Sequence, residues 1–182
     1  MSPPPPGGPD ATIRPASPAD VDDLLEMIHD LADFERSPGS VQVDRGQLHD
    51  ALFAEAPSVF AHVAAFGHRV VGMAIWFLTF STWTGRSGIH LEDLYVRPEA
   101  RATGVGRALL SELAAIAGRS GYRRVEWSVL DWNGPALGFY RSLGAVPLAG
   151  WTTFRLSGAA LAALAAAPSG GQTVDRADRL RW

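Results

Sequence analysis

Residues Leu91–Leu110 read LEDLYVRPEARATGVGRALL, and this stretch decides the fold. Its first six residues are typical of a buried strand, and a helix with an apolar face is expected over Gly104–Ala117. Between them, Arg101, Gly104 and Gly106 form the pattern R-x-x-G-x-G at the helix start. Free backbone N–H groups and the helix dipole attract an anion there, and glycine lets a pyrophosphate approach closely. The stretch therefore predicts a site for a phosphate-bearing cofactor.

Two other interpretations of these glycines are open. Two glycines also permit an ordinary turn without any ligand. A dinucleotide-binding fold is the other positive interpretation, but it requires G-x-G-x-x-G after the first strand. Here Gly106 is followed by Arg-Ala-Leu, so that pattern is not met.

The composition excludes several kinds of chemistry. The chain has 182 residues, 47% of them hydrophobic and 19% charged, with a net charge of -3. These values are typical of one globular domain and give no electrostatic support to nucleic-acid binding. All 16 basic residues are arginine and cysteine is absent. Schiff-base lysines, lysine phosphate loops, thiol nucleophiles and cysteine metal sites are therefore excluded.

No metal site and no membrane span are expected. The five histidines have no paired metal-ligand spacing. The longest nearly apolar stretch, Val70–Leu78, has nine residues, whereas a membrane-spanning helix needs about 20. Residues 1–11 are rich in proline and glycine and do not resemble a signal peptide, so a cytoplasmic protein is expected.

The chain is expected to form one α/β domain over residues 12–166, between a disordered tail at 1–11 and a flexible tail at 167–182. The order of elements predicts a mixed sheet with helices on its faces, because strand–helix–strand units require a parallel crossover. A polar loop is expected at 81–88. Strands are expected at 12–14, 59–66, 70–79, 89–96, 123–129 and 151–156, and helices at 21–32, 45–54, 104–117, 135–143 and 159–166.

These motifs resemble a known family. The turn R-x-x-G-x-G after LEDLYV, followed by WNGPALGFYRSLGA at 132–145, is similar to the GNAT superfamily of acetyl-CoA-dependent N-acetyltransferases over roughly Thr12 to Leu156. IRPA at 13–16, LADFE at 31–35 and LED at 91–93 resemble the diamine (spermidine/spermine and thialysine) N-acetyltransferases. The resemblance implies a GNAT-type domain with a mixed, mostly antiparallel sheet, and it implies a homodimer, for which 80–89 is the candidate contact loop.

The resemblance also implies acetyl-CoA as cosubstrate and no metal. The backbone of 101–106, with Arg107, would hold the pyrophosphate, and the strand would pair with the pantetheine arm. The N–H near Tyr95 would polarise the thioester carbonyl, since a strand that stops pairing exposes such groups. The residues assigned to acetyl-CoA are Leu94, Tyr95, Val96, Arg101, Ala102, Thr103, Gly104, Val105, Gly106, Arg107, Asn133 and Ala136.

Tyr140 is the candidate general acid. Asn133 and Tyr140 lie seven residues apart, which places them two turns apart on one face of a helix with Ala136 between them. The resemblance implies that Tyr140 protonates the leaving CoA thiolate. The alternative is a packed tyrosine on a helix that already carries Phe139 and Leu143.

Acidic residues are the candidates for binding the amine. An alkyl amine has a pKa of about 10 and attacks only when neutral, so a carboxylate must accept its proton. The resemblance gives this role to Glu92, while Asp93 is expected on the opposite face because strand residues alternate. In the alternative interpretation of Glu92 and Asp93, one carboxylate lies at the surface and the other pairs with an arginine. Asp93 fits this alternative. The residues assigned to the substrate are Glu35, Glu92, Asp93 and Trp132.

Glu35 corresponds to the family's acidic position for a distal ammonium group, although an ordinary solvated glutamate is an equal alternative. The chain departs from the diamine pattern at 149–152, which read AGWT where acidic residues are usual. That departure weakens the case for spermidine or spermine. We therefore expect direct acetyl transfer to a primary amine of a small cationic substrate. The alternatives are a GNAT enzyme for an amino acid, antibiotic or protein amine, and a non-catalytic acyl-CoA sensor.

Overall fold

The computed structural model describes residues 11–167. The expected tails, 1–11 and 167–182, lie outside these described residues except for the innermost residue of each. The chain divides after Leu130 into two compact units, and each is described by itself.

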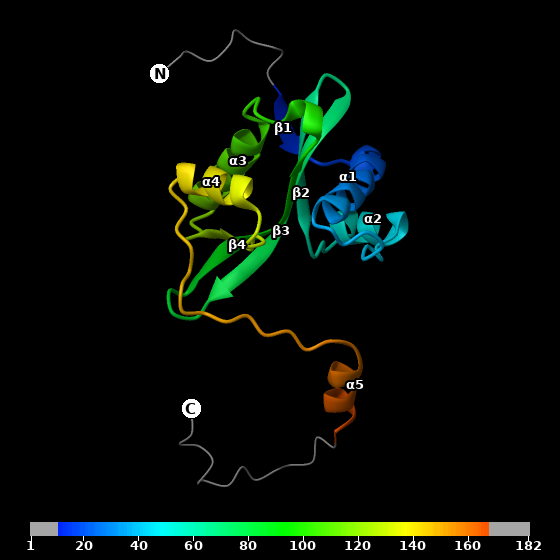
Figure 1. Cartoon of the computed structure of the whole chain (residues 1–182), viewed down its shortest axis with the longest axis vertical. Coiled ribbons are helices and arrows are strands. Elements are labelled where there is room, and N and C mark those ends of the chain that lie inside the picture. The colour runs from blue at the N-terminus through cyan, green and yellow to red at the C-terminus, as the bar shows by residue number, and fades with distance from the viewer. Residues whose placement is uncertain (1–10, 168–182) are drawn as a thin grey trace. The chain divides into compact units, whose positions relative to one another are not determined.

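The first unit contains a five-stranded sheet with helices on both faces (Figure 1). Its elements are β1 (Thr12–Pro15), α1 (Val21–Phe34), α2 (Arg45–Phe53), β2 (Phe60–Phe66), β3 (Arg69–Ser81), β4 (Arg86–Val96), α3 (Val105–Arg119) and β5 (Val125–Trp127). The strands follow chain order across the sheet, and all neighbours are antiparallel except β4 and β5, which are parallel. The helix α3 supplies the crossover that a parallel pair requires. The predicted α/β class with a mixed, mostly antiparallel sheet is confirmed.

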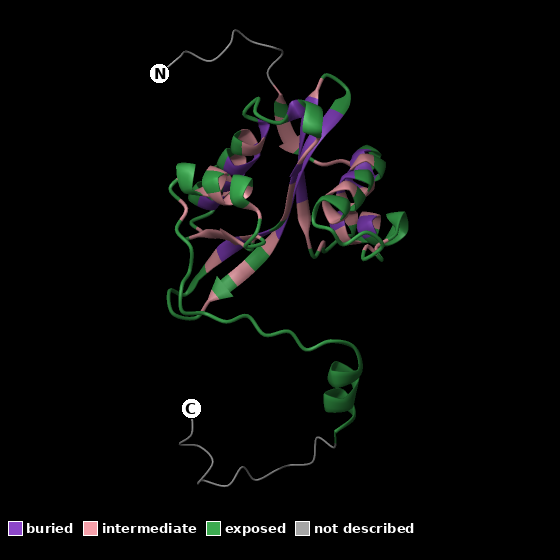
Figure 2. Ribbon diagram, in the orientation of Figure 1, coloured by how far each residue is buried: buried purple, intermediate pink, exposed green. Residues whose placement is uncertain are grey.

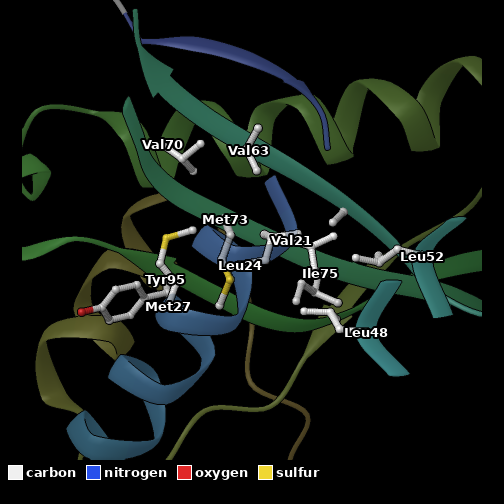
Figure 3. Close-up of a cluster of buried hydrophobic side chains, with 11 residues drawn as sticks. Val21, Leu24, Met27, Leu48, Leu52, Val63, Val70, Met73, Ile75 and Tyr95 are labelled. Atoms are coloured by element: carbon white, nitrogen blue, oxygen red, sulfur yellow. The ribbon is translucent and has the colours of Figure 1, made fainter. Parts of the chain in front are cut away.

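One face of the sheet packs against α1 and α2 and forms a hydrophobic core (Figure 3). The helix expected at 21–32 is confirmed as α1, and its residues Val21, Leu24 and Met27 are fully buried. Figure 2 shows that buried residues concentrate in the strands and on the sides of the helices that face them. The core residues are Val21, Leu24, Met27, Leu48, Leu52, Ala61, Val63, Val70, Met73, Ile75 and Tyr95.

The opposite face of the sheet packs against α3. A Cβ atom added to Gly72 of β3 would lie 3.0 Å from Val105 Cγ1 and 3.4 Å from Leu109 Cδ1. Leu109 and Leu113 of α3 are fully buried, as the helical pattern predicts. Glycine at position 72 therefore allows the start of α3 to approach the sheet closely.

An ion pair fixes the entry into α1. The Arg14 guanidinium donates to both carboxylate oxygens of Asp20 at 2.7 Å, and the N–H of Ser17 donates to Asp20 Oδ2 at 2.7 Å. These donors, Arg14 first, lower the pKa of the buried Asp20 carboxyl to about 2. The carboxylate is therefore ionised throughout the physiological range.

A second arginine joins α1 to the end of β4. Arg97 is mostly buried, and its guanidinium pairs with Glu26 at 2.7 Å, Asp23 at 3.3 Å and Asp30 at 3.8 Å. Its Nε–H also donates to the carbonyl of Val70 at 3.1 Å. This single side chain thus links an acidic helix face to two strands.

Two predicted boundaries were wrong. The expected polar loop at 81–88 is limited to a turn at 82–85, since β3 continues to Ser81 and β4 begins at Arg86. Phe80 pairs with Ser87, and strand pairing tolerates polar residues where one sheet face is open to water. The strand expected at 123–129 is confined to Val125–Trp127, because its pairing with β4 covers three residues only.

The second unit, as described, contains α4 (Gly134–Ser142) and α5 (Gly158–Ala166). The strand expected at 151–156 is wrong, because this segment has no regular structure and Phe154 is 90% exposed. A strand needs a paired neighbour for its backbone groups, and the described sheet contains β1 to β5 alone. Among the described residues, no helix is both long and apolar enough to cross a membrane.

Candidate active site

A β-bulge in β4 shapes the candidate site. Ile75 of β3 pairs with Asp93, but the next residue, Trp76, pairs with Leu91, so Glu92 is the extra residue of the bulge. A bulge inserts one residue into one strand and re-aims the side chains around it. The alternation expected for an ideal strand therefore ends at Glu92.

Glu92 and Asp93 line the same cleft, together with Glu35 at the end of α1. The cleft has a volume of about 430 Å³ and lies between α1, the segment that follows α1, and β4. The expectation that Glu92 and Asp93 occupy opposite faces was wrong, because the bulge breaks the alternation. The lining residues are Ile28, Leu31, Ala32, Glu35, Ser37, Ser40, Val41, Glu92 and Asp93.

The two adjacent carboxyl groups have different environments. Burial, followed by the like charges of Glu92 and Glu35, raises the pKa of Asp93 to about 6. The Glu92 side chain is 59% exposed, with Oε2 3.8 Å from His90 Nε2. The alternative of a surface or arginine-paired Asp93 was wrong, because Asp93 is the more buried of the two and its charged neighbours are acidic. The cleft therefore combines an exposed carboxylate with a partly buried one whose pKa is raised to about 6.

Beyond Glu92 and Asp93, the edge of β4 that faces β5 has no strand partner among the described residues. The parallel pairing with β5 ends where Leu91 meets Trp127. From Leu94 to Val96, β4 pairs with β3 on its other side, and no strand of the described chain pairs with it on the β5 side. The main chain of Leu94–Val96 can thus form hydrogen bonds to an extended ligand.

The turn between β4 and α3 presents free amides. Gly104 has φ +94° and Ala102 has φ +61°, and the left-handed region at position 104 favours glycine. The first helical hydrogen bond runs from Ala108 N–H to the Gly104 carbonyl at 2.9 Å. The amides of Val105, Gly106 and Arg107 therefore precede the helical hydrogen-bond pattern. This helix start fits the pyrophosphate of a nucleotide-bearing cosubstrate.

Other groups of this turn are engaged within the protein. The Thr103 hydroxyl donates to the Ala100 carbonyl at 2.7 Å, and Arg101 Nε–H donates to the Val96 carbonyl at 2.9 Å. The Arg101 guanidinium carbon lies 5.4 Å from the Tyr95 ring centroid and 5.5 Å from that of Phe34. The Arg101 side chain therefore contacts both β4 and the last residue of α1.

Four predicted residues, Trp132, Asn133, Ala136 and Tyr140, belong to the second unit. Asn133 is the N-cap of α4, and its Oδ1 accepts from the Ala136 amide at 3.2 Å. The Tyr140 ring centroid lies 5.3 Å from that of Phe139. The expected helix at 135–143 is confirmed as α4, with Asn133 at its start rather than inside it.

The sequence analysis did not identify the wall of the cleft formed by Ser37, Ser40 and Val41. These residues follow α1, where Arg36 adopts φ +59° and Gly39 φ +78°. The signal in the sequence was the SPGS run at 37–40, directly after Arg36, which indicates a turn. A turn at that point returns the chain toward the last turn of α1, beside the candidate carboxylate.

Comparison with known proteins decides the family. Residues 23–145 match the Acetyltransferase (GNAT) family. The chain belongs to the GNAT family of acetyltransferases. It is 38% identical to the thialysine N-epsilon-acetyltransferase of Caenorhabditis elegans over 152 residues, covering 82% of this chain and 93% of that protein. It is 36% identical over 164 residues to the enzyme of the same name from Mus musculus, covering 84% and 96%.

The fold of this GNAT protein also matches solved structures. An integron cassette protein from the mobile metagenome of V. cholerae superposes with a TM-score of 0.73 at 25% identity, covering 87% of this chain and 99% of that chain. The protein is therefore a GNAT N-acetyltransferase, and this family uses acetyl-CoA as cosubstrate. The open β4 edge and the free amides of α3 fit its pantetheine arm and its pyrophosphate.

Proposed function

We propose that this protein transfers the acetyl group of acetyl-CoA to a primary amine of a small cationic substrate of the diamine or thialysine type. The observation that supports the substrate class most strongly is the cleft that contains Glu35, Glu92 and Asp93. Three carboxylates around one cleft attract a cation, and unlike charges at close range stabilise each other most where water is excluded. The names of the two relatives point to the same class of amine.

The carboxyl pair handles the proton of the amine. An ammonium group that enters the cleft must lose a proton before its nitrogen can attack. Glu92 is exposed enough to meet the incoming ammonium and accepts its proton, directly or through water. Asp93 lies behind it, and its charge favours transfer of the proton onto the pair. An acceptor whose pKa lies near the working pH is the effective one, and the raised pKa of Asp93 moves the pair in that direction.

The main chain of β4 and the side chain of Tyr140 have the remaining proposed roles. Acetyl-CoA supplies an acetyl thioester, whose carbonyl carbon the amine attacks. The N–H near Tyr95 on the open β4 edge stabilises the negative charge that develops on the carbonyl oxygen. Tyr140 donates a proton to the departing sulfur. Binding both reactants side by side accounts for most of the acceleration, about 7–11 kcal/mol at best, and proton transfer for less.

The size of the substrate follows from the acidic positions. Glu35 holds a second cationic group at the α1 end of the cleft, so a short diamine or a thialysine-like amino acid is bound at both ends. The segment 149–152, Ala-Gly-Trp-Thr, adds no further acid for a longer polyamine. Putrescine and thialysine are therefore expected to be better substrates than spermine.

An acceptor screen tests this function. CoA release is followed with putrescine, spermidine, spermine, thialysine and lysine, with butylamine as the singly charged control. The proposal expects the highest kcat/KM with a short doubly charged amine and a lower value with butylamine. Acetyl-CoA binding without turnover of any of these amines would refute the diamine assignment. Equal turnover of the wild type and the Glu92→Gln, Tyr140→Phe double variant would instead indicate a sensor.

We also propose a homodimer that uses the end of the β3–β4 hairpin. Two aromatic side chains near this end are exposed, with Phe80 at 64% and Trp83 at 89%. Sedimentation equilibrium is expected to give the mass of a dimer for the wild type and a monomer for Trp83→Ser. A monomeric wild type would contradict the proposal.

A further inference from the structure

Arg101 makes a set of contacts that a phosphate ligand does not require. Its Nε–H is bonded to the Val96 carbonyl at 2.9 Å, and its guanidinium lies within 5.5 Å of two aromatic ring centroids. A planar cation over an aromatic ring is attracted by the ring quadrupole, and arginine makes such contacts better than lysine. The side chain is thereby held against β4 and α1, while its main chain begins the glycine turn.

The three partners of Arg101 belong to different parts of the proposed site. Val96 and Tyr95 lie on the open edge of β4, which we assign to the pantetheine arm. Phe34 is the last residue of α1 and directly precedes Glu35, which lines the carboxylate cleft. In Figure 3 the Tyr95 ring lies at the margin of the core, with its hydroxyl directed away from the other labelled residues. Arg101 therefore lies where the glycine turn before α3, the open edge of β4 and the end of α1 meet.

The end of α1 is closed by a backbone cap. Its three hydrogen bonds run from Glu35 N–H to the Leu31 carbonyl at 2.9 Å, from Arg36 N–H to the Asp33 carbonyl at 3.1 Å, and from Ser37 N–H to the Ala32 carbonyl at 2.9 Å. Arg36 adopts a left-handed φ of +59°, which is unfavourable for a residue with a side chain. A left-handed residue is a common helix cap, but arginine occupies it less favourably than glycine would, so a contact that holds this end adds to its order.

We infer that Arg101 is a positioning residue that couples occupancy of the glycine turn to the order of the α1 end, and so to the placement of Glu35 in the acceptor cleft. Binding of pyrophosphate to the turn amides fixes the Arg101 main chain. The guanidinium, held between Tyr95 and Phe34, then restrains the last turn of α1. Two ligands coupled in this way each favour the binding of the other. The inference rests on the proposed acceptor cleft, although the coupling itself can be measured without an acceptor.

Hydrogen exchange of the α1 end tests the coupling directly. Amide exchange of residues 31–37 is measured with and without saturating CoA, in the wild type, Arg101→Met and Arg101→Lys. CoA is expected to slow this exchange about fivefold or more in the wild type. Arg101→Met, which keeps the unbranched stem but not the guanidinium, is expected to bind CoA while its α1 end no longer responds. Arg101→Lys keeps the charge without the planar fork and is expected to respond partially. Arg119→Met, on the distal end of α3, is the matched control and should behave like the wild type.

Kinetics separate this role from phosphate binding. Arg101→Met is expected to raise the KM for putrescine at saturating acetyl-CoA about fivefold, whereas the Kd of CoA measured without any amine changes less than about twofold. A side chain that binds pyrophosphate would instead weaken CoA binding and leave pantetheine binding unchanged, and that result would overturn the inference. Unchanged α1 protection on CoA binding in the wild type would overturn it as well. If the wild type acetylates none of the amines, the proposed function fails, and the exchange measurement still decides the role of Arg101.

Discussion

Glu92 and Asp93 are consecutive residues of β4, yet both line one cleft because Glu92 is the unpaired residue of a bulge. Two carboxylates at this spacing repel each other when both are ionised, and Asp93 is also removed from water. The protein therefore holds a partly buried negative charge at neutral pH, and the charged groups near it, Glu92 and Glu35, are acidic as well. Such a charge destabilises the folded state, and the same charge is available to a cationic substrate.

Asp93→Asn is expected to stabilise the protein at neutral pH. The folded pKa of about 6 lies above the ordinary value of 3.8, so the folded state binds the proton more tightly than the unfolded state. Stability from this group is complete below pH 3.8 and is lost as the pH rises through 6. The shift of about two units corresponds to about 3 kcal/mol at most. Urea unfolding at pH 4 and pH 7.5 is expected to show a larger gain for the variant at pH 7.5.

Asp33→Asn is the control for this comparison, because Asp33 is an exposed aspartate near the end of α1. Its free energy of unfolding is expected to follow the wild type at both pH values. A variant Asp93→Asn that is less stable than the wild type at pH 7.5 would show that the carboxylate is held by partners and is not a destabilising charge.

The activity is expected to fall below pH 6 for the same reason. An ionised carboxyl pair and a protonated amine form the productive complex, so kcat/KM rises with pH until the pair is ionised and is then level. In the wild type, we expect kcat/KM to fall about tenfold per pH unit below pH 6, because the carboxyl pair becomes protonated there. Asp93→Asn is expected to have a lower kcat/KM that does not change with pH near pH 6. An unchanged pH dependence in that variant would show that another group causes the fall.

Much of the fold was predictable because the signals are local and repeated. The apolar spacing of α1 and α3 and the glycine turn at 104 predicted those helices correctly. The strand at 151–156 failed because strand formation depends on a neighbour, which the local pattern of Trp151 and Phe154 does not reveal. The segment is rich in aromatic and β-branched residues, as strands are, so propensity alone was misleading.

The residues of the candidate site could be predicted from the sequence, but their arrangement in space could not. The carboxylates at 35, 92 and 93 were chosen from motifs, but the bulge at Glu92 depends on pairing with Ile75 and Trp76, which lie 17 and 16 positions earlier on another strand. No composition signal marks that extra residue. The raised pKa of Asp93 follows from this bulge, so the chemical difference between two adjacent acids could not be inferred from the chain alone.

Arg97→Met is expected to lower the free energy of unfolding by about 2 kcal/mol. The change removes a partly buried hydrogen bond to the Val70 carbonyl and leaves three carboxylates of α1 facing one another. Arg45→Met removes an exposed pair with Asp22 and should cost less than about 0.5 kcal/mol. Urea unfolding at pH 7 compares the two variants, and equal losses would contradict the anchoring role of Arg97.

Acid unfolding is expected to include a contribution from Asp20. Its folded pKa of about 2 lies below the ordinary 3.8, so its stabilisation is complete above pH 3.8 and is lost as the pH falls through 2. The difference corresponds to about 2 kcal/mol. The stability advantage of the wild type over Asp20→Asn should therefore shrink by this amount between pH 5 and pH 2. In the Arg14→Met background the same difference should be much smaller, since Arg14 is the main cause of the low pKa.

Glu35→Gln is expected to discriminate between doubly and singly charged amines. Glu35 lies across the cleft from the carboxyl pair, so its charge acts on the second cationic group and not on the reacting nitrogen. An exposed ion pair is worth about 0.2–1 kcal/mol, which corresponds to a rise of up to about fivefold in the KM for putrescine. The KM for butylamine, which has no second charge, should stay within the error of the wild type, and so should both values in Asp33→Asn. Because the second charge alone distinguishes the two amines, an equal rise for both would remove Glu35 from the distal position and return it to an ordinary solvated glutamate.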